Sequence, residues 1–375
     1  MQNSTVSLNI IKVLHIRSSF DPGGTESFLL HLFNFKQDKI QFFYALIKDG
    51  VYISRLSSAN NKYFKLFRKR KIDFAILQEI SKIIKKNNID IIHTHQVFEL
   101  IYAFLLKLTH PKIQIIHNVH LYNPDNNWEH FTEKFLINFV FKVICVSNSL
   151  KEALIAKGYP AKKLHLLYNP VKTPQLPAEY DEEMFKKKIS YNPADLVTGM
   201  IGNFVNEKDQ LTIIKAYNLL RKNYPQLKLI FIGKKTSNTK LCIDATPVED
   251  LNRRVFFPGG IENASKYLKF FDLFVFSSLS ETFGIAVFEA LLMKVPVIAS
   301  GIPVMKELSV NEKYFKLFNT GNAENLAEKI KWFMNKNNKN KIVQMTERAY
   351  LYASNNFSYE RYIARLSEIY SEALN

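Results

Sequence analysis

The sequence predicts an α/β protein with two doubly wound, Rossmann-like domains that face each other across a cleft. The first observation is length, because 375 residues exceed one typical hydrophobic core and suit two domains. The second is that short apolar runs alternate with amphipathic runs, as in parallel strands connected by helices. The third is a proline-containing segment at residues 172–181, which separates two such blocks. We therefore expect domains at residues 1–172 and 181–357.

The composition favours a cytoplasmic protein that attracts anions. The chain has 51 basic and 34 acidic residues, a net charge of +17, and the first 180 residues carry +11 of it (24 basic minus 13 acidic). Such a charge attracts phospholipid surfaces, nucleic acids or phosphorylated substrates, although a basic surface also serves solubility alone. Cys145 and Cys242 show no metal or redox spacing, which favours a reducing compartment. The chain starts with polar residues, and no apolar run reaches the ~18–20 residues that span a bilayer.

The first domain opens with a strand, a glycine loop and a helix. The strand covers residues 9–16, the loop contains Gly23 and Gly24, and the helix covers residues 28–35. Two glycines allow a backbone to come close to a ligand. The loop is not the GxGxxG fingerprint of dinucleotide-binding proteins, which argues against a nicotinamide enzyme. A second strand is expected at residues 41–48.

The segment at residues 63–71 mixes aromatic residues with five basic residues. It fits a short strand followed by the solvated start of a helix at residues 73–86. It also fits a patch that binds a membrane surface or another polyanion. The sequence leaves both interpretations open.

Histidines stand at the ends of the next two expected strands, at residues 89–95 and 112–120. Ligands bind at the carboxyl ends of strands in an open α/β sheet, so His95, His117 and His120 are candidates for a ligand-binding cleft.

His93 and His95 share one face of their strand, which makes a zinc site conceivable. No third ligand follows at a metal spacing, so the sequence predicts no metal site. The domain is completed by strands at residues 141–147 and 164–168 and a helix at residues 149–157.

The second domain repeats the alternation of strands and helices. Strands are expected at residues 197–201, 227–232, 255–257, 273–276 and 295–299. Helices are expected at residues 211–224, 324–335 and 340–355, with a last amphipathic helix that ends near residue 374.

The most informative stretch follows the strand at residues 273–276. Small hydroxyl residues lead through Glu281 into a helix that opens at about Gly284, and Glu289 lies one and a half turns inside that helix. The N-terminus of a helix presents free backbone N–H groups, which bind phosphate well. Two carboxylates beside an anion site suit a ligand that carries both phosphates and neutral hydroxyls, as a nucleotide sugar does. An ordinary turn with two solvated glutamates is the alternative.

Several motifs in the same order resemble the retaining GT-B glycosyltransferases of family 4, also called glycosyl transferases group 1. The family's paired glutamates match Glu281 and Glu289, within an E-x-F-G pattern that includes Phe283 and Gly284. Its G-R-x-x-x-x-K loop matches residues 202–208, and its G-G-x-E loop matches residues 23–26. Weaker matches occur at residues 146–147, 169–171 and 296–299.

The resemblance implies a role for each matching residue. Glu289 would accept hydrogen bonds from the ribose hydroxyls, and Glu281 would contact hydroxyls of the transferred sugar. Lys208 would hold the diphosphate, together with the backbone N–H groups of residues 283–285. The donor site would thus contain Gly202, Asn203, Lys208, Glu281, Phe283, Gly284, Ile285 and Glu289, facing Gly23, Gly24 and a histidine of the first domain. The family's histidine follows a Thr-x-His pattern at a strand end, and Asn118-Val-His120 lies where that pattern falls, so His120 is preferred to His117.

One residue departs from the family pattern. Asn203 occupies the position of the family's arginine, so it can form hydrogen bonds but brings no charge. The stabilisation of the leaving group would then depend more on Lys208 and on the helix N-terminus.

The resemblance also implies an activity and its partners. The reaction would move a sugar from a UDP- or GDP-linked donor to a lipid-linked or growing surface glycan, such as bacterial capsule or lipopolysaccharide, with retention of configuration. No Asp-x-Asp motif occurs in the chain, which agrees with a metal-independent enzyme that needs no cofactor. Residues 358–375 would cross back onto the first domain, as in relatives. An anionic membrane on the inner face of the cell is an expected further partner, and nucleic acid is not.

The sequence also leaves three other functions open. A GT-B-type sugar-nucleotide epimerase would separate nucleotide from sugar without an acceptor. A phosphorylase would need a lysine-bound pyridoxal phosphate. A non-catalytic module would bind a membrane or polyanion through residues 63–71.

Overall fold

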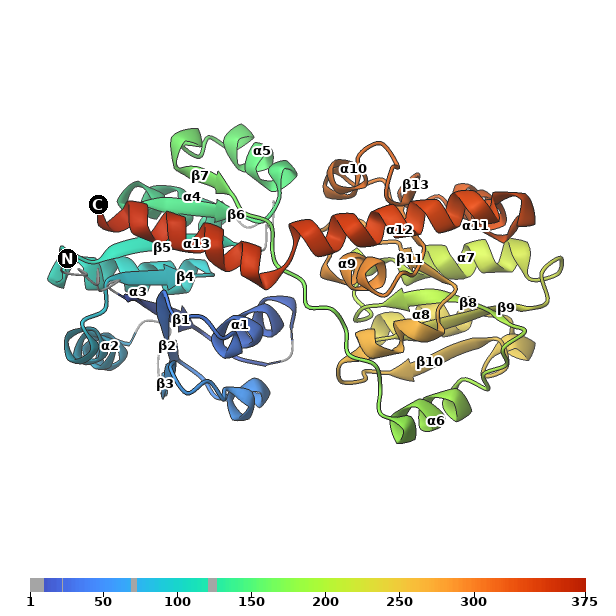
Figure 1. Ribbon diagram of the computed structural model, residues 1–375, viewed down its shortest axis with the longest axis horizontal. Coiled ribbons are helices and arrows are strands. Elements are labelled where there is room, and N and C mark those ends of the chain that lie inside the picture. Colours follow the sequence, from blue (N-terminus) through green and yellow to red (C-terminus); the bar gives the residue numbers. More distant parts are fainter. Residues whose placement is uncertain (1–9, 22, 69–72, 121–126) are drawn as a thin grey trace, which may run out of the picture. The chain divides into compact units, whose positions relative to one another are not determined.

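The computed structural model describes residues 10–21, 23–68, 73–120 and 127–375. The chain forms two compact units, which are described separately (Figure 1). Unit 1 contains residues 1–170 and 359–375, and unit 2 contains residues 171–358. Residues 69–71 of the aromatic and basic segment lie outside the described residues.

Unit 1 is built on a parallel sheet of seven strands, in the order β3-β2-β1-β4-β5-β6-β7. The order changes direction between β1 and β4, as in doubly wound folds. The strands are β1 (Ile11–Arg17), β2 (Ile40–Leu46), β3 (Lys62–Lys65), β4 (Ile91–Thr94), β5 (Gln114–Val119), β6 (Lys142–Cys145) and β7 (Leu164–Leu166). All but β3 and β7 are mostly buried, which explains their nearly continuous apolar sequences.

The helices of unit 1 include two that the sequence analysis did not find, α3 and α4. In α3, apolar residues occupy nearly every position, so no polar stripe marks it as a surface helix. In α4, aromatic side chains face solvent and an acidic side chain is buried, which reverses the usual pattern. The helices are α1 (Gly24–Asn34), α2 (Phe74–Asn87), α3 (Val97–Thr109), α4 (Asn127–Leu136), α5 (Asn148–Ala156) and α13 (Tyr359–Leu374).

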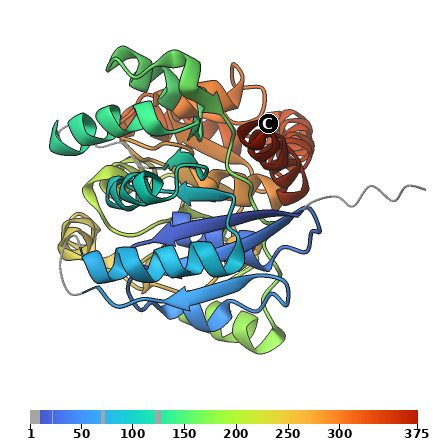
Figure 2. The ribbon, with the colours of Figure 1, turned by 90° about the vertical axis from the view of Figure 1, so that its left-hand side faces the viewer.

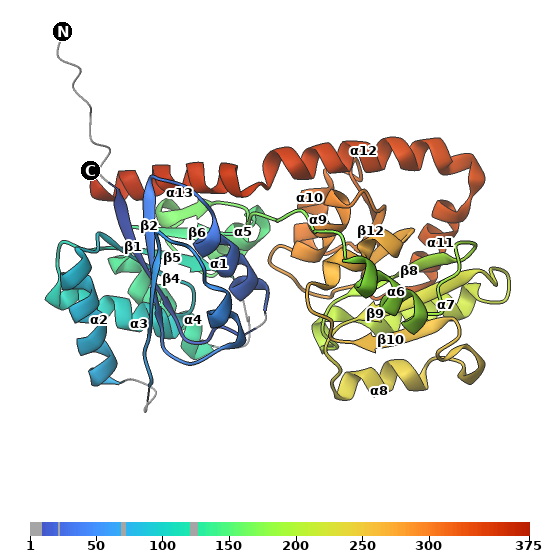
Figure 3. The same cartoon turned by 60° about the horizontal axis from the view of Figure 1, so that its bottom comes forward.

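The C-terminal helix α13 belongs to the core of unit 1. Its apolar face packs with residues of α1, β1 and β2 in one buried cluster. The Tyr370 hydroxyl lies 2.6 Å from His93 Nδ1 on β4, and Lys142 on β6 pairs with Glu372. Figures 2 and 3 show α13 lying against the sheet of this unit. The sixteen residues of α13 thus complete a fold that the first 170 residues begin.

Unit 2 is built on a parallel sheet of six strands, in the order β10-β9-β8-β11-β12-β13. The strands are β8 (Leu196–Ile201), β9 (Leu227–Ile232), β10 (Val255–Gly259), β11 (Leu273–Phe276), β12 (Val297–Ser300) and β13 (Lys316–Phe318). The helices are α6 (Glu179–Lys188), α7 (Gln210–Leu220), α8 (Ser237–Asp244), α9 (Ile285–Leu292), α10 (Pro303–Ser309), α11 (Ala323–Met334) and α12 (Lys339–Asn356). Four elements of this unit are short and weakly periodic, and the sequence did not predict them: α6, α8, α10 and β13.

The two sheets confirm the predicted class of two doubly wound α/β domains. Within the described residues, no helix combines the length and the apolarity needed to cross a membrane.

Candidate active site

The candidate site of unit 2 lies where β8, β9 and β11 end. Gly202 follows β8, and Gly233 follows β9. A Cβ atom on Gly233 would stand 1.9 Å from the Gly202 carbonyl oxygen, so only glycine allows these two strand ends to approach so closely. Ser277 follows β11, and its Oγ lies 2.8 Å from the carbonyl oxygens of both Lys208 and Asp209, which share its one hydroxyl proton. These contacts join segments that are about seventy residues apart in the sequence.

Lys208 and Glu281 form an ion pair at this edge of the sheet. The Lys208 side chain is 26% exposed and the Glu281 side chain 18%, so the pair is partly shielded from water but accessible to a ligand. Ser278 Oγ lies 3.4 Å from Glu281 Oε1, and the Lys208 ammonium lies 5.4 Å from the centre of the Phe276 ring. The structure therefore brings together the lysine and the glutamate that the sequence placed in separate motifs.

Helix α9 begins directly after the turn that carries Glu281. Its N-cap, Gly284, has φ of 89° and ψ of 57°, a left-handed conformation that favours glycine. A Cβ there would stand 2.6 Å from Met305 Cε. Phe283 is buried and stacks on Phe288, with ring centres 4.9 Å apart. Because a glycine cap offers no side-chain acceptor, the first N–H groups of α9, starting at Ile285, suit an anionic ligand.

Glu289 lies in the second turn of α9 and is partly buried. Burial raises the pKa of its carboxyl to about 7, against the opposing effect of a hydrogen bond with Ser265. A carboxyl that is half protonated near neutral pH can both accept hydrogen bonds and donate one. The sequence did not predict this property, because it depends on residues that surround α9 in space.

The Asn203 side chain forms a hydrogen bond within the protein. Its Oδ1 accepts a hydrogen bond from the Lys234 backbone N–H at 3.0 Å, and the Lys234 carbonyl accepts one from Phe204 N at 3.1 Å. The loop after β8 is thereby fastened to the residues that follow β9. Lys234 and Lys235 are exposed at this edge and form no ion pair within the described parts of the chain. They were not among the residues predicted for the site, although the sequence places both lysines directly after a glycine at the end of a buried strand.

In unit 1, three of the histidines form a chain of hydrogen bonds. His15 Nδ1 lies 2.9 Å from His95 Nε2, and His95 Nδ1 lies 3.0 Å from His120 Nε2. Burial lowers the pKa of His15 and of His120 to about 3, and it lowers the pKa of His95 well below the usual range. The three rings are therefore neutral at pH 7, and His95 in the middle can donate to one neighbour and accept from the other.

His15, His93 and His95 lie close enough together to be considered as metal ligands. The His15 and His95 rings are inclined by 12° and the His93 and His95 rings by 16°. Zinc requires ring lone pairs that converge on one point at about 2.0–2.1 Å, which nearly parallel rings do not provide. The 2.9 Å separation between His15 Nδ1 and His95 Nε2 is also that of a hydrogen bond. The geometry therefore favours a hydrogen-bonded chain of imidazoles over a zinc site.

The structure also distinguishes His117 from His120. His117 Nδ1 lies 2.8 Å from Thr94 Oγ1, and His117 Nε2 lies 2.9 Å from Glu133 Oε1, so both ring nitrogens have protein partners. Burial alone would raise the pKa of Glu133, but hydrogen bonds from His117 and Tyr159 hold it below its usual value. His117 is thus used to attach α4 to β5.

The glycine loop leads directly into α1, which begins at Gly24 with Gly23 as its N-cap. Glu26 pairs with Arg17, and Arg17 Nη1 also lies 3.1 Å from Glu99 Oε1 on α3. Glu99 accepts further bonds from the backbone N–H groups of Ser18 and His95. This buried network holds the ends of β1 and β4. No sequence pattern predicts it, because Arg17 and Glu99 are 82 residues apart.

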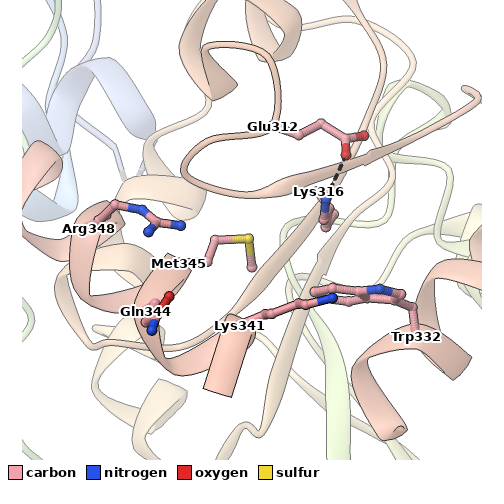
Figure 4. Close-up of a pocket in the computed structure, with 7 residues that line it drawn as sticks. All are labelled: Glu312, Lys316, Trp332, Lys341, Gln344, Met345 and Arg348. Carbon is pink, nitrogen blue, oxygen red and sulfur yellow. Dashed lines mark hydrogen bonds and ion pairs between the residues drawn. The ribbon is translucent and has the colours of Figure 1, made fainter. Parts of the chain in front are cut away.

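A cavity of about 220 Å³ lies elsewhere in unit 2 (Figure 4). It is lined by Glu312, Lys316, Trp332, Lys341, Gln344, Met345 and Arg348. Lys316 begins β13, so the cavity lies toward the amino ends of the strands, at the edge opposite to Lys208 and Glu281.

Comparison with known proteins identifies the family. Residues 181–352 match the family model described as glycosyl transferases group 1, and residues 48–175 match the model described as glycosyltransferase family 4. The chain belongs to the group 1 glycosyltransferases. Their GT-B fold accounts for the two doubly wound domains, and the enzyme class predicted from the sequence is confirmed.

Two curated relatives illustrate the similarity of this glycosyltransferase to bacterial proteins. The capsular polysaccharide biosynthesis glycosyltransferase CapH of Staphylococcus aureus is 26% identical over 319 residues, which cover 82% of this chain and 85% of CapH. The UDP-Gal:alpha-D-GlcNAc-diphosphoundecaprenol alpha-1,3-galactosyltransferase of Escherichia coli is 24% identical over 290 residues, covering 72% and 75% of the two chains.

A solved structure shares the fold of this glycosyltransferase. Alr3699/HepE of Anabaena, in complex with UDP and glucose, superimposes with a TM-score of 0.82 at 19% sequence identity. The match covers 96% of this chain and all of the Anabaena chain. At this level of identity the likeness shows the fold.

The raised pKa of Glu289 predicts a pH-dependent stability. The folded state holds the Glu289 proton up to a pH of about 7, whereas the unfolded chain releases it near its usual pKa of about 4.5. The folded state therefore binds more protons in this window, and the free energy of unfolding should fall as pH rises from about 4.5 to about 7. Glu289→Gln should remove this decrease and stabilise the protein by about 1–3 kcal/mol above pH 7. Urea unfolding at several pH values measures it, and identical pH profiles for both proteins would contradict the assignment.

Proposed function

We propose that this glycosyltransferase moves a sugar from a UDP- or GDP-linked donor to a lipid-linked or growing surface glycan, with retention of configuration and without a metal ion. The observation that carries the proposal is the Lys208–Glu281 pair beside the start of α9. A cation and helix N–H groups suit a diphosphate, and carboxylates suit sugar hydroxyls. The printed names of CapH and of the E. coli relative support a capsular or lipid-diphosphate-linked acceptor. The UDP and glucose bound to the Anabaena protein support a nucleotide-sugar donor.

In this proposal, each end of the donor meets a different group of unit 2. Glu289 binds the ribose hydroxyls, and its raised pKa allows its carboxyl to accept from one hydroxyl and donate to the other. Glu281 binds hydroxyls of the transferred sugar. The Lys208 ammonium has three N–H groups, so it can contact Glu281 and a phosphate oxygen together. The pair then connects the sugar end of the donor with its diphosphate end.

The reaction breaks the bond between the anomeric carbon and the phosphate oxygen and forms a bond to the acceptor oxygen on the same face. The acceptor hydroxyl gives its proton to the departing phosphate, so no protein base is required. Negative charge grows on the leaving nucleotide, where Lys208 and the N–H groups at the start of α9 stabilise it. His120 stays neutral, because burial lowers its pKa to about 3. It therefore orients sugar or acceptor hydroxyls through hydrogen bonds rather than donating a proton as a cation.

Lys208→Ala should slow transfer. Removal of a charged group that stabilises the leaving nucleotide is expected to lower kcat by about 10²-fold or more. Lys240→Ala is the matched control, because Lys240 is an exposed lysine of the same unit that pairs with Asp244 in α8. Both variants are assayed for release of nucleoside diphosphate in the presence of acceptor. Full activity of Lys208→Ala would exclude this residue from the diphosphate site.

Glu289→Ala should weaken nucleotide binding, because it removes the groups that hold the ribose. Loss of a buried hydrogen-bonding partner costs about 1–3 kcal/mol, so the Kd should rise by about tenfold or more. Calorimetry with uridine, guanosine and adenosine diphosphates measures the affinity and identifies the preferred base. An unchanged affinity for each diphosphate that the unaltered protein binds would refute the ribose role.

The proposed mechanism predicts full turnover in excess chelator. Lys208 and the N–H groups of α9 neutralise the leaving diphosphate, a task that a divalent cation performs in metal-dependent transferases. The assay compares initial rates in chelator, in Mg²⁺ and in Mn²⁺. Activity that disappears with chelator and returns with one of the metals would show that the mechanism is metal-dependent.

A further inference from the structure

Helix α4 and the turn after it expose four large aromatic side chains. The exposed fractions are 51% for Trp128, 77% for Phe131, 54% for Phe135 and 42% for Phe139. The three residues within the helix are spaced by three and four positions, so they lie on one side of it. We call these four residues the α4 aromatic face. Large apolar groups that gather on a surface mark an interaction site, whereas single ones need no explanation.

The outward direction of this face is held by a polar contact on the opposite side of the helix. Glu133 is buried, and its carboxylate contacts His117 Nε2 at 2.9 Å and the Tyr159 hydroxyl at 2.7 Å. Leu136 is buried beside it. A rotation of α4 that buried the aromatic rings would expose this hydrogen-bonded carboxylate and break both contacts. The aromatic face is therefore a stable feature of the folded unit.

Neighbouring rings extend the face onto α3, which packs beside α4. The Phe98 and Trp128 ring centres are 5.5 Å apart, and those of Phe104 and Phe139 are 4.7 Å apart. Leu108, near the end of α3, is 65% exposed. The exposed apolar groups thus come from two adjacent helices, α3 and α4 (Figures 1 and 3).

Lysines accompany the aromatic residues. Residues 128–163 contain six lysines and three glutamates, without arginine or aspartate, and one of the glutamates is the buried Glu133. Lys134 Nζ lies 3.2 Å from the Lys157 carbonyl, which places the C-terminal end of α5 beside α4. Lys163 Nζ contacts the carbonyls of residues 137, 138 and 140, so its ammonium lies against the backbone of the turn that contains Phe139. The segment that carries the aromatic face is therefore basic.

We propose that the α4 aromatic face binds the interface of an anionic lipid bilayer. Aromatic rings enter the boundary between headgroups and acyl chains, and lysines around them contact lipid phosphates. Charge complementarity favours a bilayer over a second copy of this chain, because two copies would bring basic surfaces together. The inference rests on the proposed lipid-linked acceptor, which reaches an enzyme from a membrane. It places the membrane contact on α4 rather than on the segment at residues 63–71.

Sedimentation with vesicles tests the proposal on the full chain. The probes are vesicles of phosphatidylcholine alone and of phosphatidylcholine mixed with phosphatidylglycerol. We expect binding to the mixed vesicles, and a loss of about tenfold or more in the double variant Phe131→Ser with Phe135→Ser. Phe74→Ser is the matched control, because Phe74 is 74% exposed at the start of α2 in the same unit. Binding that is lost in Phe74→Ser and kept in the double variant would overturn the proposal.

Tryptophan fluorescence gives a second test, which does not depend on variants that replace apolar side chains with serine. The chain contains two tryptophans, Trp128 in α4 and Trp332 in α11. Mixed vesicles should shift the emission to shorter wavelength. Trp128→Phe should abolish the shift and keep the binding, and Trp332→Phe should keep both. A shift that persists in Trp128→Phe would contradict insertion of α4.

Two further measurements separate this inference from the proposed function and from self-association. Calorimetry with the preferred nucleoside diphosphate should give the same Kd for the double variant and the unaltered protein. Nucleotide binding and vesicle binding are thus measured independently, so the vesicle result can be interpreted even if the proposed donor site is wrong. Equal thermal midpoints would show that both proteins are folded. Absence of vesicle binding by the unaltered protein would refute the inference. So would a dimer in sedimentation velocity that the double variant abolishes while vesicles remain unbound, because the face would then be a contact between copies.

Discussion

The candidate donor site depends on one ion pair, between Lys208 and Glu281. Beside the pair, Ser277 Oγ contacts the carbonyls of Lys208 and Asp209, which holds the loop after β8 against the end of β11. Without those two contacts, a long flexible lysine would gain little from an accessible carboxylate. With them, a positive and a negative group are held next to the start of α9. That arrangement suits a donor whose diphosphate is charged and whose sugar is neutral.

Each unit has its own kind of polar group near the carboxyl ends of its strands. Unit 2 offers charges and helix N–H groups, which respond to charge that develops on a leaving nucleotide. Unit 1 offers imidazoles that burial keeps neutral, connected from His15 through His95 to His120. Neutral rings in a hydrogen-bonded chain have defined orientations and serve to position hydroxyl groups. We therefore propose that groups of unit 2 stabilise the charge on the leaving nucleotide and that the imidazoles of unit 1 position hydroxyl groups.

The sequence predicted most strands well, because buried parallel strands are short apolar runs that end in glycine or small polar residues. β9 and β11 have the residues that were expected. The missed helices α3 and α4 show the limit of periodicity. Helix α3 lies among apolar neighbours, and α4 turns its aromatic side outward, so neither presents an apolar stripe facing a core. The aromatic residues of α4 were visible in the sequence, but their exposure was not.

By itself, the sequence determined the alternation of strands and helices, the motif residues from Gly202 to Glu289, and the position where a charge is missing, at Asn203. These are local properties, since they depend on residue type and spacing. Only the tertiary structure decided that Lys208 meets Glu281, that Asn203 bonds to Lys234, and that His117 is occupied by Glu133. It also decided the pKa of Glu289 and the outward face of α4. Burial and contact between distant segments arise when the chain folds, and no local pattern specifies them.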